Sequence, residues 1–218
     1  MNSSPDSRLS ALRVTLARPL DLAEVHDLLD AAGQRLAARG FPNWLPAYPR
    51  DRLTTDIDEG IVRVVRDVMG TIVATFMLRN TPVHSYHGIT WGDDNAKARY
   101  LNRLAVLPER HGQGIGAWCL RQIHNESMGA SFGAIRCDVL QANVPLRRFY
   151  EDHGYVRRGE RYHTGWHFTV YERVLRLGLV DGGTEDSGRT TDALTIPAPG
   201  ERRLTLLPTE HRRRRTDK

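Results

Sequence analysis

The segment at residues 111–117 combines residue types and spacing that suit the binding of a phosphate group. Its glycines, Gly112, Gly114 and Gly116, stand at every second position, between an apolar run that ends at Pro108 and a helix-forming stretch. Glycine lets the backbone approach a ligand closely, so successive amide N–H groups can point into one cavity. The helix that follows adds unpaired N–H groups and the positive end of its dipole. The segment therefore predicts an anion site, most naturally for a phosphate of a cofactor.

The same residues also fit a dinucleotide-binding fingerprint. Gly112, Gly114 and Ala117 have the required spacing, and Asp138 follows Ala117 by 21 positions. Such a fingerprint should come directly after its strand, but residues 108–111 intervene. It should also open a series of strand–helix units, whereas the chain beyond this point has room for only one more helix and a few strands. The order of the chain therefore favours a different phosphate-bearing cofactor.

The pattern of apolar residues predicts the elements that position this segment. A helix with an apolar stripe is expected from Leu22 to Leu36, with Gly40 just beyond its end, and Asp21 and Glu24 are expected to form a capping box at its start. The three prolines within residues 41–49 predict an aromatic-lined loop. Strands are predicted at 12–18, 61–66, 71–79, 100–107, 134–140, 155–158 and 166–175, further helices at 114–128 and 144–153, and a long loop at 81–99.

The composition predicts a cytoplasmic protein with one core. The chain has 218 residues, 40% of them hydrophobic, which is enough to fold without disulfides. No apolar run approaches the roughly 20 residues of a membrane-spanning helix, and the first residues lack the layout of a secretory signal. The two cysteines, Cys119 and Cys137, lie in apolar segments and are expected to be buried, reduced thiols. We therefore expect no membrane contact and no metal site.

The charge distribution favours anionic partners, and a phosphorylated cofactor would satisfy it as well as nucleic acid would. The net charge is +5 with histidine counted as neutral, a balance that attracts anions. Polar residues, glycine and arginine dominate after residue 178, so we predict a flexible N-terminus at 1–10, a folded domain at 11–178 and a disordered, arginine-rich tail at 179–218. The arginine run at 212–215 is nearly balanced by acidic residues elsewhere in the tail, and we do not expect nucleic-acid binding.

The glycine segment and the strand before it resemble motif A of the GNAT N-acetyltransferase family. In that motif a strand ends in Val-x-Pro, as Val106 and Pro108 do here, and a loop with two glycines follows, matched by Gly114 and Gly116. His111 stands where the family usually has arginine or glutamine, which is a departure. Because the residue chiefly offers its backbone N–H, the resemblance still implies cofactor binding at this loop.

A second segment is similar to motif B of the same family. Asn143 is followed at the expected spacing by Phe149 and Tyr150, and then by Gly154 and Tyr155. The order of elements over residues 12–175 also agrees with the family. The resemblance therefore implies an α/β (α+β) fold of the GNAT type, with a mixed, mostly antiparallel sheet of six to seven strands flanked by about four helices.

The resemblance also implies acetyl-CoA as co-substrate and names its contacts. The backbone of the strand would pair with the pantetheine arm, the N–H of Val106 would stabilise the oxyanion, and Tyr150 stands at the position of the general acid. Asn143 matches a cofactor-contacting residue and would equally serve as a helix N-cap. The implied cofactor-binding residues are Leu104, Ala105, Val106, His111, Gly112, Gln113, Gly114, Ile115, Gly116, Ala117, Asn143, Arg148 and Tyr150.

The general base and the amine acceptor are left open by the sequence. Asp138, at the end of the strand at 134–140, is the first candidate base, Asn102 could orient a water, and Glu109 is better suited to the surface. A relay through water is a further alternative, and three loop histidines could reach the site: His84, His87 and His163. Aromatic residues could line a pocket for a cationic or apolar amine: Trp44, Tyr48, Trp91, Tyr162 and Trp166.

Together these features predict an N-acetyltransferase, monomeric or homodimeric, that moves an acetyl group from acetyl-CoA to a primary amine of a small molecule or peptide by direct attack. One alternative is a regulatory module that binds acyl-CoA without catalysis. A less favoured alternative is a dinucleotide-binding Rossmann protein.

Overall fold

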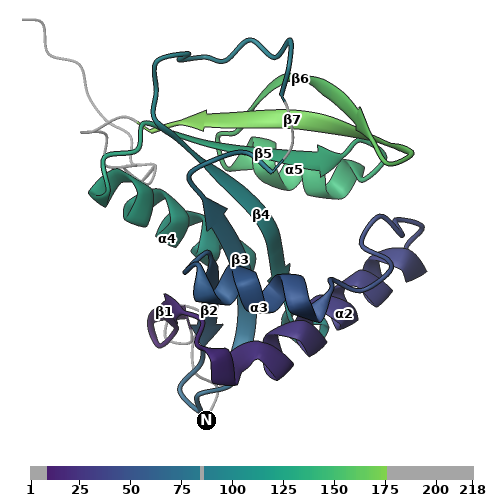
Figure 1. Cartoon of the computed structure of the whole chain (residues 1–218), viewed down its shortest axis with the longest axis vertical. Helices are drawn as coiled ribbons and strands as arrows, with labels where there is room; N and C mark the ends of the chain where they lie inside the picture. Colours follow the sequence, from purple (N-terminus) through teal and green to yellow (C-terminus); the bar gives the residue numbers. More distant parts are fainter. Residues whose placement is uncertain (1–8, 84–85, 176–218) are drawn as a thin grey trace, which may run out of the picture. The chain divides into compact units, whose positions relative to one another are not determined.

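A seven-stranded sheet forms the centre of the fold (Figure 1). The computed structural model describes residues 9–83 and 86–175, so residues 1–8, His84 and the predicted tail at 179–218 lie outside the described residues. The strand order is β1-β2-β3-β4-β5-β7-β6, and every neighbouring pair is antiparallel except β4–β5. This is the mixed sheet that the family resemblance implied. It excludes the dinucleotide-binding alternative, which requires a doubly wound parallel sheet. The strands are β1 (Arg13–Leu16), β2 (Val62–Arg66), β3 (Ile72–Arg79), β4 (Ala98–Val106), β5 (Ala134–Leu140), β6 (Val156–His163) and β7 (Trp166–Val174).

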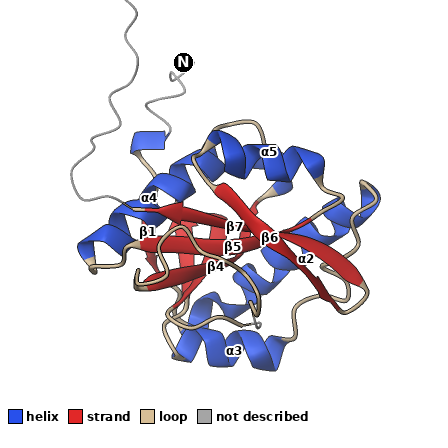
Figure 2. Cartoon of the chain, turned by 90° about the horizontal axis from the view of Figure 1, so that it is seen from above, coloured by secondary structure: helices blue, strands red, loops and turns tan. Residues whose placement is uncertain are grey.

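Four helices cover the two faces of this sheet (Figure 2). On one face, α2 and α3 pack through Val25, Leu29 and Leu53 against the strands of the N-terminal half. On the other, α4 and α5 contribute to a core that includes Ile123 and Tyr150. The sheet is therefore buried on both sides, which is why β3 reads as a nearly continuous apolar run. The helices are α2 (Leu22–Ala38), α3 (Arg50–Asp58), α4 (Ile115–Gly129) and α5 (Val144–Asp152), with short 3-10 turns at Pro19–Asp21 and Pro108–Arg110.

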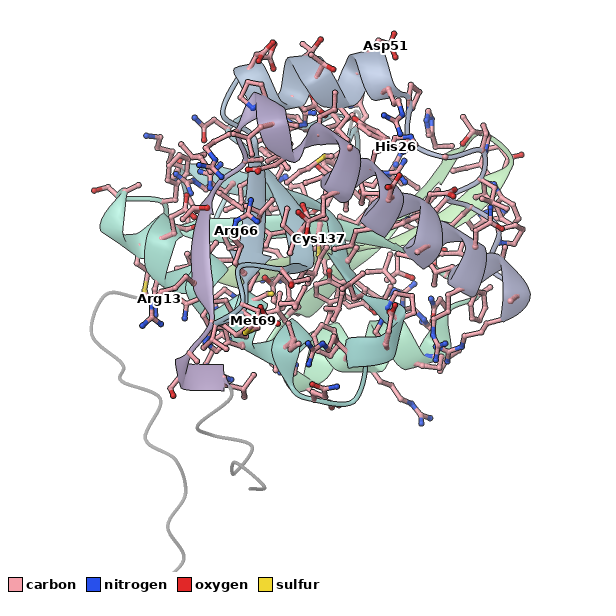
Figure 3. All side chains as sticks on the ribbon, turned by 90° about the horizontal axis from the view of Figure 1, so that it is seen from below. Arg13, His26, Asp51, Arg66, Met69 and Cys137 are labelled. Atoms are coloured by element: carbon pink, nitrogen blue, oxygen red, sulfur yellow. The ribbon has the colours of Figure 1, made fainter. Side chains whose placement is uncertain are left out.

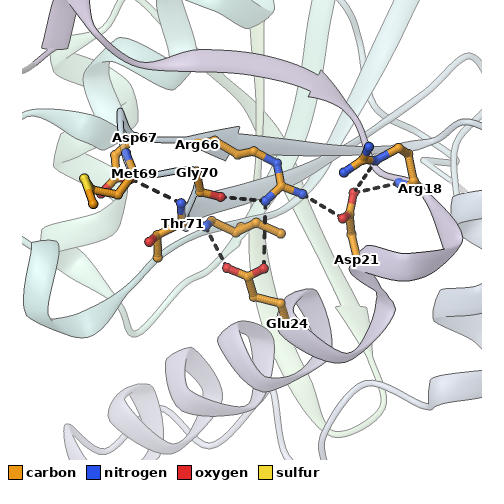
Figure 4. A network of polar contacts seen from close by, with 9 residues as sticks. Arg18, Asp21, Glu24, Arg66, Asp67, Met69, Gly70 and Thr71 are labelled. Atoms are coloured by element: carbon orange, nitrogen blue, oxygen red, sulfur yellow. Dashed lines mark hydrogen bonds and ion pairs between the residues drawn. The ribbon is translucent and has the colours of Figure 1, made fainter.

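The predicted capping box at the start of α2 is wrong. Asp21 makes no side-chain cap bond to the helix. Its carboxylate instead accepts from the backbone N–H of Arg18 at 2.9 Å and pairs with Arg66 of β2 at 2.7 Å. Glu24 accepts from the backbone N–H of Ile72 at 2.7 Å (Figure 4). Because tertiary partners outcompete the local cap, these two carboxylates fasten α2 to the β2–β3 hairpin rather than closing its own first turn.

Two elements differ from the prediction because their sequences are polar. Helix α3 was not predicted, since only Leu53 and Ile57 of its nine residues are apolar, and both are buried on the sheet. Strand β6 extends to His163, well beyond the predicted end at residue 158. As the edge strand of the sheet it exposes much of its surface, so it carries charged residues that hide the strand pattern.

The two cysteines are free and buried, as predicted. Cys137 of β5 lies in the interior of the fold, whereas Asp51 and Arg13 lie at its margin (Figure 3). Burial raises the pKa of the Cys119 thiol to about 12 and raises that of Cys137 as well. Both thiols are therefore packing residues of the core, held in the neutral form.

Candidate active site

The one parallel pair of strands in the described sheet is also the place where the sheet opens. β4 and β5 pair only from Ala98 to Tyr100 and from Ala134 to Arg136. Beyond that point β4 continues beside β3, and β5 continues beside β7, so the two strands separate. The separation leaves a main-chain edge of β4 without a neighbouring strand. Such an edge is a template for an extended ligand.

A bulge in β4 accompanies the separation. Asn102 pairs with Met77 and Ala105 pairs with Thr75, so Arg103 and Leu104 together oppose a single residue of β3. Arg103 has a φ of 51°, in the left-handed region that few side-chain-bearing residues adopt. A bulge re-aims the side chains of its strand. Here it places Arg103 on the wall of the opening.

A cavity of about 700 Å³ occupies the opening. This volume is within the range of small-molecule and cofactor sites. Its walls come from α2 and the following loop (Ala32, Arg35, Leu36, Arg39, Asn43, Trp44), β4 (101–106), the glycine loop and the start of α4 (110–112, 114–117), β5 and α5 (138–140, Asn143, Pro145, Leu146, Phe149, Tyr150), and the β6–β7 hairpin (Arg161, His163, Thr164, Phe168).

The glycine loop has the geometry that its sequence predicts. Gly112 and Gly114 have φ values of 75° and 78°, which glycine adopts without strain. Gly114 is the N-cap of α4, and no side chain caps that helix. Its first-turn N–H groups are therefore left for a ligand. Gly116 lies so close to α5 that a Cβ there would be 3.3 Å from the Phe149 ring. The loop thus lines the cavity and has the unpaired N–H groups that an anion site requires.

The backbone of Val106 faces the opening. The N–H of Leu107 bonds to the carbonyl of Val73 at 2.9 Å. Because main-chain groups alternate along an antiparallel ladder, the N–H and C=O of Val106 point away from β3. The carbonyl is met there by Nε2 of His111 at 2.9 Å. The departure from the usual motif thus has a local role, since the His111 ring ties the glycine loop to the end of β4.

Tyr150 lines the cavity from the buried face of α5. Asn143 starts this helix, and its side-chain oxygen accepts from the N–H of Leu146 at 3.2 Å, so the predicted N-cap is confirmed. The Tyr150 ring packs edge-on against Tyr155 and Phe149. Burial, and then the nearby Cys137 and Asp138, raise the pKa of Tyr150 well above its ordinary value. Its hydroxyl is therefore a proton donor at neutral and moderately alkaline pH.

Asp138 is the only carboxylate among the described residues that line the cavity. Both of its oxygens have partners: the hydroxyl of Tyr86 donates at 2.9 Å, and Arg161 of β6 pairs at 3.1 Å. Burial, with the adjacent Asp138 charge, raises the pKa of Tyr86. These contacts hold the carboxylate in place, and each oxygen keeps a second lone pair that can accept a proton.

Most of the predicted cofactor residues meet at the cavity. Gln113 and Arg148 do not line it, and Arg148 is exposed on α5. Of the further candidate bases, His163 lines the cavity, as does Asn102, the residue that could orient a water, whereas His87 and Glu109 are exposed and do not line it.

The predicted aromatic pocket is largely wrong. Of its five residues only Trp44 lines the cavity. Trp91 stacks with Arg136 at 4.0 Å and Tyr162 is 65% exposed. Sequence reasoning missed Arg103, Tyr86 and Arg161, because no local pattern marks a residue at a bulge or a partner that reaches over from another strand.

The described residues contain no cluster of three or more His, Cys, Asp or Glu side chains that could hold a metal ion. Within the same part of the chain, none of the helices has the length and apolar character needed to span a bilayer.

Comparison with known proteins connects this geometry with a family. A family model described as an acetyltransferase (GNAT) domain matches residues 59–157, which include β4, the glycine loop and β5. The chain is 29% identical over 143 residues to an uncharacterized N-acetyltransferase, YesJ, of Bacillus subtilis, a match that covers 64% of this chain and 78% of that protein.

Solved structures share the fold. A GNAT-family acetyltransferase from Streptococcus agalactiae superposes with a TM-score of 0.66 at 21% identity, covering 75% of this chain and 95% of that one. The PaiA N-acetyltransferase of Thermoplasma acidophilum, solved in complex with coenzyme A, gives a TM-score of 0.59 at 14% identity, covering 75% and 98%. With the sheet that separates between β4 and β5, these matches identify residues 59–157 as a GNAT acetyltransferase domain, and the acyl donor of that family is acetyl-CoA.

Proposed function

We propose that this protein transfers the acetyl group of acetyl-CoA to a primary amine by direct attack of the amine on the thioester. The observation that carries the proposal is a single cavity that joins an anion site, an unpaired strand edge and a buried tyrosine. Each of these parts suits a different piece of the reaction: the phosphates, the pantetheine arm and the leaving thiolate.

The cofactor is proposed to lie along the glycine loop and β4. Its diphosphate would accept from N–H groups at residues 112–117, where the start of α4 favours negative charge. The pantetheine amides would pair with the edge of Leu104, Ala105 and Val106 left free by the departure of β5. The acetyl carbonyl would then lie near the N–H of Val106, which points away from β3 and can stabilise an oxyanion.

Asp138 and Tyr150 are proposed to handle the protons. An alkylamine has a pKa of about 10, so at neutral pH it must lose a proton before it attacks. Asp138 takes that proton directly or through a water as the C–N bond forms. When the C–S bond breaks, Tyr150 donates its proton to the sulfur, because burial keeps the hydroxyl protonated. Each proton transfer of this kind increases the reaction rate by about a hundredfold or more.

The site of this activity in the cell is proposed to be the cytoplasm. The two cysteines, Cys119 and Cys137, remain free although the fold buries both of them. Free cysteines without any disulfide are typical of a reducing compartment.

The direct test is release of coenzyme A thiol from acetyl-CoA when a panel of amines is added to the purified protein. The protein adds little background to a thiol reagent, because both of its cysteines are buried with raised pKa values. Amine-dependent release supports the transferase. Thermal stabilisation by acetyl-CoA without release on any amine would instead identify a module that binds acyl-CoA without catalysis.

A further inference from the structure

The walls of the cavity other than the glycine loop carry an excess of positive charge. Arg35 of α2, Arg39 just after that helix and Arg103 of β4 all line the cavity. None of them forms an ion pair with a carboxylate within the described part of the chain. The one carboxylate there, Asp138, is already paired with Arg161. These walls therefore offer three guanidinium groups that form no ion pair among the described residues, the opposite of a cage for a cationic amine.

Arg103 is the most buried of the three. Its guanidinium lies between two aromatic rings, 4.9 Å from the centre of Trp44 and 4.8 Å from that of Tyr48. Burial lowers the pKa of Arg103, while the nearby Tyr48 and Asp138 oppose that shift. The two ring faces offset only part of the free-energy cost of removing the cation from water. An anionic ligand bound to the guanidinium would offset the rest of that cost.

The two rings are held in place by their own contacts. Trp44 packs against Gly33 of α2, where a Cβ would be 3.4 Å from the Trp44 carbonyl oxygen. The Tyr48 hydroxyl donates to the buried carboxylate of Asp56 at 2.8 Å, and Asp56 is paired with Arg79 at 2.5 Å. The guanidinium is thus positioned before any ligand arrives. Preorganisation of this kind reduces the cost of binding.

A second unsatisfied group lies beside Arg103. The side-chain oxygen of Asn102 is buried and has no hydrogen-bond partner among the described residues, and Asn102 lines the same cavity. A buried oxygen of this kind can accept a hydrogen bond from an amine. Arg103, by contrast, can only donate. At neighbouring positions, Asn102 therefore offers a hydrogen-bond acceptor for an amine nitrogen and Arg103 offers donors for an anion.

We infer that the acceptor carries an acidic group as well as its amine, and that Arg103 binds this group. The proposed acceptors are amino acids, whose carboxylate neutralises the Arg103 guanidinium that lies between Trp44 and Tyr48. This inference rests on the proposed acetyl transfer and narrows its acceptor. Arg35 and Arg39, which are exposed at the rim, attract the anion toward the site.

The test uses acceptors that differ only in the acidic group. Each set contains an amino acid, its carboxamide and the amine that lacks the carboxyl group, for example phenylalanine, phenylalaninamide and phenethylamine, together with sets of other side-chain sizes. Thiol release at saturating acetyl-CoA gives kcat/KM for each. We expect the carboxylate member of the best set to exceed both others by about tenfold or more, as one charge-assisted bond provides.

Variants assign the preference to Arg103. In Arg103→Gln we expect KM for the amino acid to rise by about tenfold or more, with a much smaller change for the amine that lacks the carboxyl group. Acetyl-CoA affinity serves as the measure of an intact fold. Arg121→Gln is the matched control, because Arg121 is exposed on α4 and does not line the cavity; it should keep the preference.

A measurement on the unaltered protein guards against a variant that fails to fold. The carboxylic acid that lacks only the amine, here 3-phenylpropionate, should inhibit competitively against the amino acid and not against acetyl-CoA. The inference is overturned if amines without a carboxylate react as well as amino acids, if no such inhibition occurs, or if folded Arg103→Gln retains the preference. Thiol release only with amines that lack a carboxylate overturns this inference and leaves acetyl transfer standing, whereas no release with any amine overturns both.

Discussion

The two ends of the cavity are built from different parts of the chain. The cofactor end uses backbone groups: the N–H groups of the glycine loop, the start of α4 and the free edge of β4. The proposed acceptor end uses side chains from α2, the loop after it, β4 and the β6–β7 hairpin. Backbone groups recognise what every acyl-CoA shares, whereas side chains can be exchanged without altering the fold. The difference shows how one scaffold keeps its donor and varies its acceptor.

The largest expected effect is at the cofactor end, for Gly114→Val. A branched side chain is strained at a φ of 78° and would also meet Leu9 at 3.4 Å. We expect the Kd for acetyl-CoA to rise by about a hundredfold, the equivalent of two charge-assisted hydrogen bonds. Isothermal titration calorimetry measures the change. Gly129→Ala, at the open end of the same helix with no atom near its added methyl, is the control.

Tyr150→Phe tests the proposed proton donor, which lines the same cavity as both ends. The ring packing is retained and the hydroxyl is lost, so kcat should fall by about a hundredfold while the Kd for acetyl-CoA changes little. Because burial raises the pKa of Tyr150, the parent protein keeps this proton donor as the pH rises. Equal changes in kcat and in cofactor affinity would show that Tyr150 only packs or binds.

Tyr48 tests whether the acceptor end depends on the support of Arg103. Tyr48→Phe keeps a ring beneath the guanidinium and loses the bond to Asp56, whereas Tyr48→Leu removes the ring as well. We expect KM for an amino acid to rise by about threefold in the first and by about tenfold in the second, in line with a cation–π contact of about 1 kcal/mol. Steady-state kinetics at saturating acetyl-CoA gives both values, and equal effects would argue against the ring contact.

The smallest effect is expected at the rim. Arg35→Gln and Arg39→Gln remove exposed charges that attract an anion without contacting it closely. We expect kcat/KM for an amino acid to fall by about two- to threefold at low ionic strength and to match the parent near about 0.5 M salt, where screening removes long-range attraction. A loss that persists at high salt would show that these side chains bind the acceptor directly.

The parts of the fold that could be read from the sequence are those with strong local signals. The glycine loop, the buried strand β5 and the cap of α5 by Asn143 follow from spacing and residue type, and the structure has each where it was predicted. Helix α3 and the outer part of β6 were missed, because their polar sequences carry little hydrophobic periodicity. The capping box at Asp21 was wrong because Arg66, distant in sequence, competes for the same carboxylate.

The sequence by itself determined the family, the anion-binding loop and the identity of the buried tyrosine, because each depends on residues close together along the chain. Only the tertiary structure decided the charge of the acceptor end. Arg103 lies at a bulge between Trp44 and Tyr48, residues from a loop more than fifty positions earlier, and Asp138 is paired by Arg161 from another strand. The physical reason is that a guanidinium placed without a counter-ion is a property of its surroundings, and those surroundings exist only once the chain has folded.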